Sequence, residues 1–214
     1  TGLTDNFVIL RDITEEKRLE ANNKTIMRIS ALLPEYPELE DLMNYISKEV
    51  KVLLKTEGAM VLLYDEITDE LFFTGASYDN SDTEKRAKKF RFPADTMLAG
   101  KIIKTGEYAM VNDVEKLAND HPERDNTLGY KTKSLLEVPI KSEDRIIGVL
   151  CAINKKQNRF DYSDMELMTM IAGTVAISIE NARFSEAVRM AYRDVASMNR
   201  AKGKAINHLS HELK

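Results

Sequence analysis

The chain of 214 residues has few of the residues that mark disulfide-stabilised, zinc-binding or membrane-spanning proteins. Its one cysteine, Cys151, excludes an internal disulfide and is typical of a reducing compartment. Three histidines and no Cys-X-X-Cys pair give no zinc motif, so we expect no metal. The longest apolar run, around residues 146–153, is far shorter than the roughly 20 residues of a membrane span, and no signal peptide opens the chain. These absences predict a cytoplasmic chain without membrane contact, and leave open an anchor elsewhere in a longer parent protein.

The composition is that of a soluble globular protein with long exposed helices. Hydrophobic residues make up 43% of the chain and charged residues 31%. The formal net charge of −4 argues against a nucleic-acid partner, which would require a basic surface.

A long amphipathic helix is predicted from Ser163 to the C-terminus. Ser163 and Glu166 have the spacing of a capping box, which would start the helix. Counting along this helix from Leu167 in alternating steps of three and four residues gives an almost entirely apolar series, which is typical of a coiled coil. The series consists of Leu167, Met170, Thr174, Ile177, Asn181, Phe184, Val188, Ala191, Val195, Met198, Lys202, Ala205 and Leu209. No domain sequence remains after about Ala187 to cover it, so we expect a parallel homodimer whose register Asn181 would fix.

A second helix is predicted near the N-terminus, over residues 15–33. Its apolar positions are Leu19, Ile26, Ile29 and Leu33, and Pro34 ends it. Two arrangements are open for this helix. It pairs with its symmetry mate in a dimer, or it lies beside the C-terminal helix.

Between the two helices, the pattern predicts an α+β fold with an antiparallel sheet and helices packed on it. An amphipathic helix over residues 38–55 precedes a hairpin of strands 59–64 and 70–77, and a second hairpin pairs strands 134–140 and 145–154. A short helix over residues 97–104 and a short strand over 108–111 lie between the hairpins. The basic run at residues 81–92 either draws an anionic ligand or is a solvated surface, and we favour the solvated surface.

The second hairpin and the residues after it resemble a GAF domain. The resemblance rests on Leu-Leu-Glu-Val-Pro-Ile at 135–140, Ile-Gly-Val-Leu at 147–150 and Ala-Ile-Ser-Ile-Glu-Asn-Ala-Arg at 176–183, and spans about residues 34–186. Asn154, Lys155, Phe160 and Asp164 also match the Asn-Lys…Phe…Asp-Glu motif of cyclic-nucleotide GAF domains, although Met165 replaces the final Glu. This motif implies a structural Lys155–Asp164 pair that braces the turn from strand to helix.

The resemblance also implies a small-molecule pocket between the sheet and the segments 81–104 and 112–129. Glu137 is of interest because a carboxylate in an apolar strand needs a partner, either a ligand or a nearby cation such as Lys133, and we favour the cation. The candidate pocket residues are Tyr78, Phe92, Met97, Asp113, His121 and Glu137. No cysteine lies where bilin-binding relatives attach their chromophore, so any ligand should bind non-covalently. We do not expect haem, because its axial ligand would have to be His121, a lone loop histidine.

The two ends of the chain resemble parts of two-component sensor histidine kinases. Residues 7–17 are similar to the end of a PAS domain, and Ser210-His211-Glu212-Leu213-Lys214 resembles the H-box. This resemblance implies that His211 accepts phosphate and that Glu212 is its acid–base partner. It also implies that ATP binds only to a catalytic domain absent from this sequence, so that the chain alone is inactive, and that a response-regulator receiver domain is the partner.

We therefore expect four segments: the tail of a PAS domain (1–13), a linker helix (14–33), a GAF domain (34–187), and a signalling helix with a truncated H-box (188–214). The alternative is a non-enzymatic ligand-binding or dimerisation GAF module of a cyclase, phosphodiesterase or transcription regulator. Such effectors have no need of the Ser-His-Glu-Leu-Lys ending, which favours the kinase.

Overall fold

The computed structural model describes residues 38–116, 125–126 and 128–212, together with Glu20, Asn23, Lys24 and Met27. For residue 201 and residues 203–212 the description covers the backbone alone. The expected PAS tail at residues 1–13 and His121 lie outside the described residues. The expected linker helix also lies outside them, except for the four named residues, which are helical.

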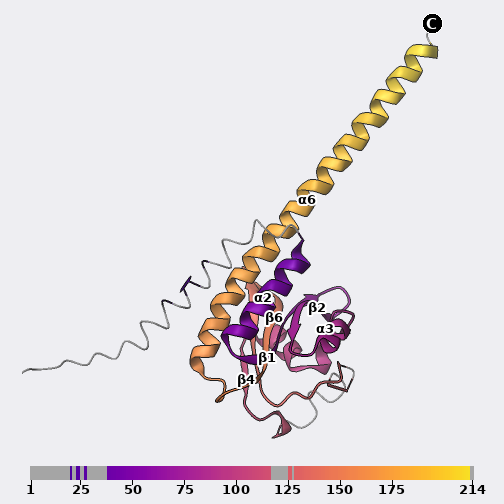
Figure 1. Ribbon diagram of the computed structural model, residues 1–214. Helices are drawn as coiled ribbons and strands as arrows, with labels where there is room; N and C mark the ends of the chain where they lie inside the picture. The colour runs from indigo at the N-terminus through magenta and orange to yellow at the C-terminus, as the bar shows by residue number, and fades with distance from the viewer. Residues whose placement is uncertain are drawn as a thin grey trace, which may run out of the picture.

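A six-stranded antiparallel sheet forms the centre of the domain, as the α+β pattern predicted (Figure 1). Its strand order is β3-β2-β1-β6-β5-β4. The strands are β1 (Thr56–Asp65), β2 (Glu70–Tyr78), β3 (Arg91–Pro93), β4 (Ala109–Val111), β5 (Leu135–Ser142) and β6 (Arg145–Lys155). The long strands β1 and β6 pair with each other in the middle of the sheet, where both of their faces are covered.

Two helices, α2 (Leu39–Leu53) and α6 (Tyr162–Glu212), cover one face of this sheet. Both follow the 3.6-residue period that buries one stripe of a helix. The buried stripe of α2 includes Met43, Ile46 and Val50. Gly75 permits the close approach of α2 to β2, because a Cβ atom at that position would lie 2.3 Å from the Met43 carbonyl.

The opposite face of the sheet is covered by α3 (Ser81–Ala87), α4 (Leu98–Thr105), the short 3₁₀ turns η2 (Ala94–Thr96) and η3 (Val114–Lys116), and the segments around them. The sequence had predicted a solvated polar run where α3 lies. The Asn80 side chain caps this short helix by accepting hydrogen bonds from the backbone of Asp82 and Thr83 at 2.9 and 3.4 Å. Only Thr83 and Ala87 of α3 are buried, which is too little apolar periodicity to reveal a helix from the sequence.

The start of α6 differs from the predicted capping box at Ser163 and Glu166. The Asp161 carboxylate accepts from the Asp164 backbone N–H, and the Asp164 carboxylate accepts in return from the Asp161 N–H, both at 3.0 Å. This reciprocal pair satisfies two backbone donors at the helix start. The spacing of three residues was right, but the box lies two residues earlier.

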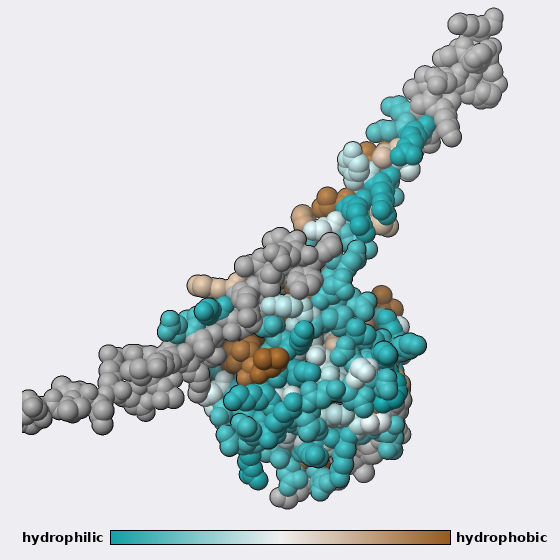
Figure 2. All heavy atoms as spheres, in the orientation of Figure 1, coloured by the Kyte–Doolittle hydropathy of each residue, from teal (hydrophilic) through white to brown (hydrophobic). Residues whose placement is uncertain are grey.

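Beyond its start, α6 has two different apolar faces. The first, with Ile171, Val175 and Ile179, is buried against the sheet. The second is the heptad series from Ile177 onward, in which Ile177 is 61% exposed and Phe184 is 72% exposed, whereas Leu167 and Thr174 at its beginning are buried. This series continues onto the part of the helix that projects beyond the domain, where Figure 2 shows hydrophobic side chains in brown. Among the described residues, no helix is both long enough and apolar enough to cross a membrane.

Candidate functional site

Most of the predicted pocket residues share the sheet face covered by α3 and α4. Tyr78, Phe92 and Met97 belong to one buried hydrophobic cluster there, in which the Phe92 ring meets Phe73 edge-on at 5.8 Å. Glu137 is fully buried and pairs in the sheet with Cys151 and Ala109.

The other predicted residues do not all belong to this hydrophobic cluster. Since alternate strand residues point to the same face, Glu137 shares its face with Leu135, a member of the hydrophobic cluster. Asp113 is half-buried just after β4, and Lys133, the cation considered for Glu137, is exposed. Cys151 is buried in the middle of β6.

A partly buried polar cluster adjoins this face where β1 and β6 meet the segment before β5. We call Glu57, Tyr130 and Asn154, with the backbone of residues 131–134, the Asn154 cluster. The Asn154 amide nitrogen lies 2.9 Å from Glu57 Oε2, 2.9 Å from Tyr130 Oη and 2.8 Å from the Lys131 carbonyl. Its amide oxygen accepts from the backbone N–H groups of Lys133 and Ser134, at 2.6 and 3.2 Å. The Asn154 side chain, which is 3% exposed, thus links β1, β6 and the segment before β5.

Asn154 adopts a backbone conformation that suits its residue type. Its φ of +55° lies in the left-handed region, which asparagine tolerates better than most residues. Asn154 follows the last pair between β5 and β6, Leu135 with Ile153, and its amide is directed into the cluster.

Tyr130 connects the Asn154 cluster to the predicted pocket. Its ring packs edge-on against Tyr78 at 5.4 Å, and its hydroxyl donates to Glu57 Oε2 at 2.9 Å. Burial, reinforced by this hydrogen bond to Glu57, raises the pKa of Tyr130 far above its ordinary value. The phenol is thus protonated and can donate this hydrogen bond to Glu57.

The residue after Asn154 connects the same cluster to α6. The Lys155 N–H donates to Ser134 Oγ at 3.2 Å, and the Lys155 ammonium pairs with the Asp164 carboxylate that also caps α6. This ion pair confirms the Lys155–Asp164 prediction. Both side chains are 13% exposed, and the ammonium lies 5.7 Å from the centre of the buried Phe160 ring.

The segment that carries Tyr130 has two further anchors. The Asp125 carboxylate accepts from the backbone N–H of Thr132 at 2.6 Å and from its hydroxyl at 2.9 Å. Arg86 on α3 donates to the Leu128 carbonyl from Nε at 3.0 Å and from Nη2 at 2.7 Å. Glu57, Arg86 and Tyr130 were not predicted, because their partners in this site are 24 to 97 residues away and no local pattern marks them.

The predicted phosphoacceptor pair lies at the far end of α6. The backbone of His211 and Glu212 is helical, in the last turn of that helix. Among the residues that the structure describes, no group of three His, Cys, Asp or Glu side chains is arranged to hold a metal ion.

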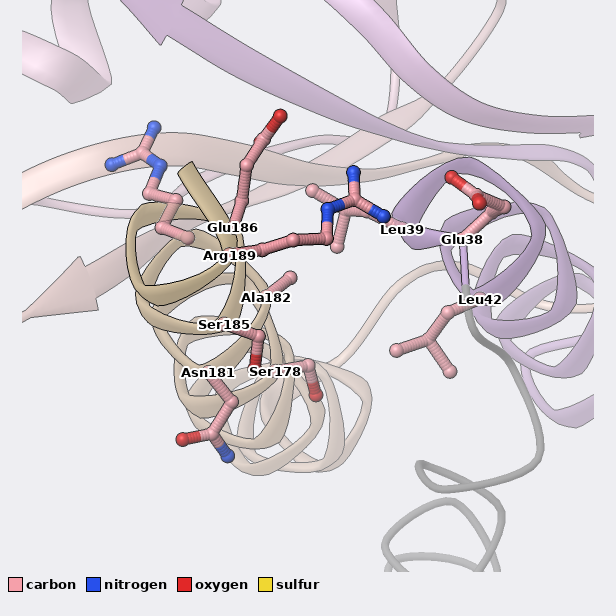
Figure 3. Close-up of a pocket in the computed structure, with 10 residues that line it drawn as sticks. Glu38, Leu39, Leu42, Ser178, Asn181, Ala182, Ser185, Glu186 and Arg189 are labelled. Atoms are coloured by element: carbon pink, nitrogen blue, oxygen red, sulfur yellow. The ribbon is translucent and has the colours of Figure 1, made fainter. Parts of the chain in front are cut away.

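A separate groove of about 420 Å³ lies on the other face of the domain, between the N-terminus of α2 and the middle of α6 (Figure 3). Leu39 and Leu42 point from α2 toward α6, and Ser178, Asn181 and Ser185 lie along the facing side of α6. The complete lining is Glu38, Leu39, Leu42, Ser178, Asn181, Ala182, Arg183, Ser185, Glu186 and Arg189. This groove shares no residue with the predicted pocket.

Comparison with known proteins relates the chain to cyclic-nucleotide phosphodiesterases. It is 34% identical over 118 residues to dual 3',5'-cyclic-AMP and -GMP phosphodiesterase 11A of Takifugu rubripes, a match covering 54% of this chain and 13% of that enzyme. The first curated relatives are matched over only 13–21% of their length.

Solved structures share the fold. A GAF domain of a Coxiella burnetii phosphoenolpyruvate-protein phosphotransferase superposes with a TM-score of 0.67 at 19% identity, covering 78% of this chain and 96% of that one. A domain assigned to a two-component sensor histidine kinase of Sinorhizobium meliloti 1021 superposes with a TM-score of 0.54 at 19% identity, covering 71% and 97%. The family model of the GAF domain matches residues 38–179, and the chain therefore belongs to the GAF domain family.

Proposed function

We propose that this chain is the cytoplasmic sensory module of a two-component sensor histidine kinase. It passes a ligand signal, or a signal from an upstream PAS domain, through a dimeric helix to the phosphoacceptor His211. The proposed segments are the PAS tail (1–13), the linker helix (14–33), the GAF domain (34–187) and the signalling helix with the truncated H-box (188–214). The similarity in fold to a domain assigned to a sensor histidine kinase is compatible with this proposal.

The observation that carries the proposal is the continuity of α6. This single helix of 51 residues is packed on the sheet at its beginning and ends at Glu212 in the H-box-like sequence. A change in how its first turns pack would therefore be transmitted along a rigid element to His211. Its start is held by Asp161, Asp164 and Lys155, and so is linked to the Asn154 cluster on the pocket side of the sheet.

The chemistry assigned to the last turn needs a nucleophile and a base. A neutral imidazole, with an ordinary pKa of about 6.5, attacks the γ-phosphoryl group of ATP. In the proposed mechanism, the Glu212 carboxylate accepts the proton of the far ring nitrogen and so increases the nucleophilicity of the attacking nitrogen. The bond formed joins the imidazole nitrogen to phosphorus, and the bond broken releases ADP. ATP would be held by the catalytic domain that follows in the parent protein.

A parallel homodimer is part of the proposal, since the exposed heptad series needs a partner. Val188 and Val195 occupy the same core position in successive heptads, and they are 53% and 52% exposed in the single chain. Val188→Asp combined with Val195→Asp is expected to weaken dimerisation by at least about 100-fold, because both charges would be buried. Light scattering at micromolar concentration measures the change.

Arg193→Asp is the matched control for the dimer. It changes the net charge by the same two units but lies on the opposite side of α6, so the dimer should persist. The proposed dimer would be contradicted if the wild-type chain were a monomer, or if the double variant and this control weakened dimerisation equally.

Phosphate transfer tests the function directly. With an ATP-binding kinase domain joined after Lys214, incubation with γ-labelled ATP should give a label that is stable to base and lost in acid, as expected of a phosphoramidate. A response-regulator receiver domain added afterwards should remove the label. Labelling that is absent, or that is stable to acid, would contradict the kinase assignment.

The second candidate function is a ligand-binding GAF module of a cyclic-nucleotide phosphodiesterase. The identity of 34% to phosphodiesterase 11A favours it, as does the matched Asn154, Lys155, Phe160 and Asp164 motif. This candidate predicts calorimetric binding of cyclic AMP or cyclic GMP together with no transfer of phosphate to His211. The kinase proposal requires the transfer, so one preparation distinguishes the two functions.

A further inference from the structure

The β5–β6 hairpin contacts α6 at the point where this helix leaves the sheet. Ser142, which is 7% exposed, donates from Oγ to Glu180 Oε1 at 2.8 Å. Arg145 Nη2 lies 3.9 Å from the same carboxylate oxygen. Within the part of α6 whose side chains are described, Ile179 is the last buried residue. Glu180 therefore lies at the boundary between the packed and the projecting parts of the helix (Figure 1).

A β-bulge in β6 brings Arg145 to the same face of the sheet as Ser142. The pairing of β5 with β6 shifts between Ile140 and Lys141, and Ile147 is the extra residue on β6. One extra residue reverses which side chains of a strand point to each face. Ser142 and Arg145 are directly paired beyond the bulge, and paired side chains share a face of the sheet. The bulge thus directs both side chains toward α6.

Strand β6 holds α6 at both of its ends. Arg145 and Lys155 are the first and last residues of this strand. Lys155 pairs with Asp164 at the start of α6, and Arg145 lies near Glu180, about 24 Å further along the helix axis. The helix cannot slide along the sheet without breaking one of these contacts. The movement that remains is a change of direction at the exit, where Glu180 lies.

The contact at the exit is easier to open than the contact at the start. The side chains of Lys155 and Asp164 are each 13% exposed, whereas that of Glu180 is 39% exposed. Water screens ion pairs that are this exposed, so the charge-assisted hydrogen bond from Ser142 contributes most to holding Glu180. Arg183, one turn further along α6, lies 4.0 Å from Glu180 Oε1 and offers a competing partner on the helix itself.

We infer that Glu180 is a positioning residue: held by Ser142, its carboxylate fixes the direction in which α6 leaves the domain and thereby the place of His211. The role in phosphate transfer rests on the proposed function. About 46 Å of helix separates Glu180 from His211, so a small change of angle at the exit becomes a large displacement at the phosphoacceptor. Glu137, a predicted pocket residue, lies on the same strand as Ser142. A shift of β5 on the pocket side would therefore reach this contact.

Pulsed electron paramagnetic resonance measures the direction of α6 in the whole chain. One spin label is attached at Ile67→Cys, in the turn after β1, where the side chain is 96% exposed. The other is attached at Arg193→Cys on the projecting part of α6, and dilution with unlabelled chains leaves only the distance within one chain. Cys151 is 1% exposed and is not labelled. Ser142→Ala and Glu180→Ala should each broaden the distribution of this distance at least about twofold, because the exit contact is lost.

Glu180→Gln and Glu166→Ala are the matched controls for the distance measurement. Glutamine at position 180 keeps an oxygen that accepts from Ser142, so the width should stay within about 1.3-fold of the wild-type value. Glu166 is an exposed glutamate on the packed part of the same helix, and its replacement should leave the width unchanged. The inference is overturned if Glu180→Ala does not broaden the distribution, or if Glu180→Gln broadens it equally.

The rate of phosphate transfer gives a second measurement. With a kinase domain joined after Lys214, Glu180→Ala should lower the initial rate of labelling at least about tenfold, because His211 spends less time in the productive geometry. Glu166→Ala should leave the rate unchanged. The distance measurement needs no ATP, so a wild-type chain that takes up no label contradicts the proposed function, while the distances still decide the role of Glu180 in fixing the helix. If the wild type and Glu180→Ala are labelled at the same rate, Glu180 does not position His211.

Discussion

Replacing His211 by glutamine is expected to abolish phosphate incorporation when the kinase catalytic domain is joined to the chain or supplied in trans. Glutamine keeps the size and polarity of the side chain but has no nucleophilic nitrogen. Loss of the only group that forms the phosphoramidate should lower labelling by at least about 10³-fold. The measurement is acid-labile label per chain, after circular dichroism has shown that the variant keeps its helix content.

His208→Gln is the matched control, three residues earlier on the same helix. Residues three apart lie on neighbouring parts of a helix surface, so His208 has a similar general position. It lacks a following glutamate, however, and should not accept phosphate. Its replacement is expected to leave labelling within about twofold, while Glu212→Gln should slow it by about 10²-fold or more, as for loss of a general base. Label that survives His211→Gln, or disappears with His208→Gln, would refute the assignment.

The second large effect is expected at Asn154, on the stability of the domain. Asn154→Ala removes the amide that bonds the backbone of Lys133 and Ser134 and contacts Glu57. Several partly buried polar groups would then lose a hydrogen bond, at the lower end of the about 1–3 kcal/mol that each buried group costs, so we expect a total loss of about 3 kcal/mol. For a domain of this size the melting temperature should fall by roughly 10 °C. Thermal unfolding followed by circular dichroism measures it.

Two further variants separate the lost hydrogen bonds from backbone strain. Asn158 also has a positive φ, of +62°, but is exposed, so Asn158→Ala should cost no more than about 1 kcal/mol. Asn154→Gly relieves the backbone while still removing the amide, and should lose nearly as much stability as Asn154→Ala. If Asn154→Gly were as stable as the wild type, the cost would arise from the backbone and the cluster would contribute little.

Elements with strong local patterns were predictable from the sequence. The stripe of α2, the hairpin of β1 and β2, and the apolar run of β6 all appear where the sequence pattern placed them. The short elements α4 and β4 were also predicted, but two others were not: α3 was predicted as a solvated run, and β3 was not predicted at all. Both are short, and their stability comes from contacts with distant residues, such as that of Arg86 with the Leu128 carbonyl.

By itself, the sequence determined the α+β class, the antiparallel sheet, the long final helix with its exposed heptad series, and the Lys155–Asp164 pair. These follow from periodicity and from motifs whose members are close together in the chain. Only the tertiary structure decided where α6 is capped, which residues meet in the Asn154 cluster, and that a groove lies between α2 and α6. Glu57 and Asn154 are 97 residues apart, and Leu39 and Ala182 are farther still. Residues so far apart in the chain meet because the sheet brings its strand ends and covering helices together. No local pattern in one of the two segments specifies the other segment.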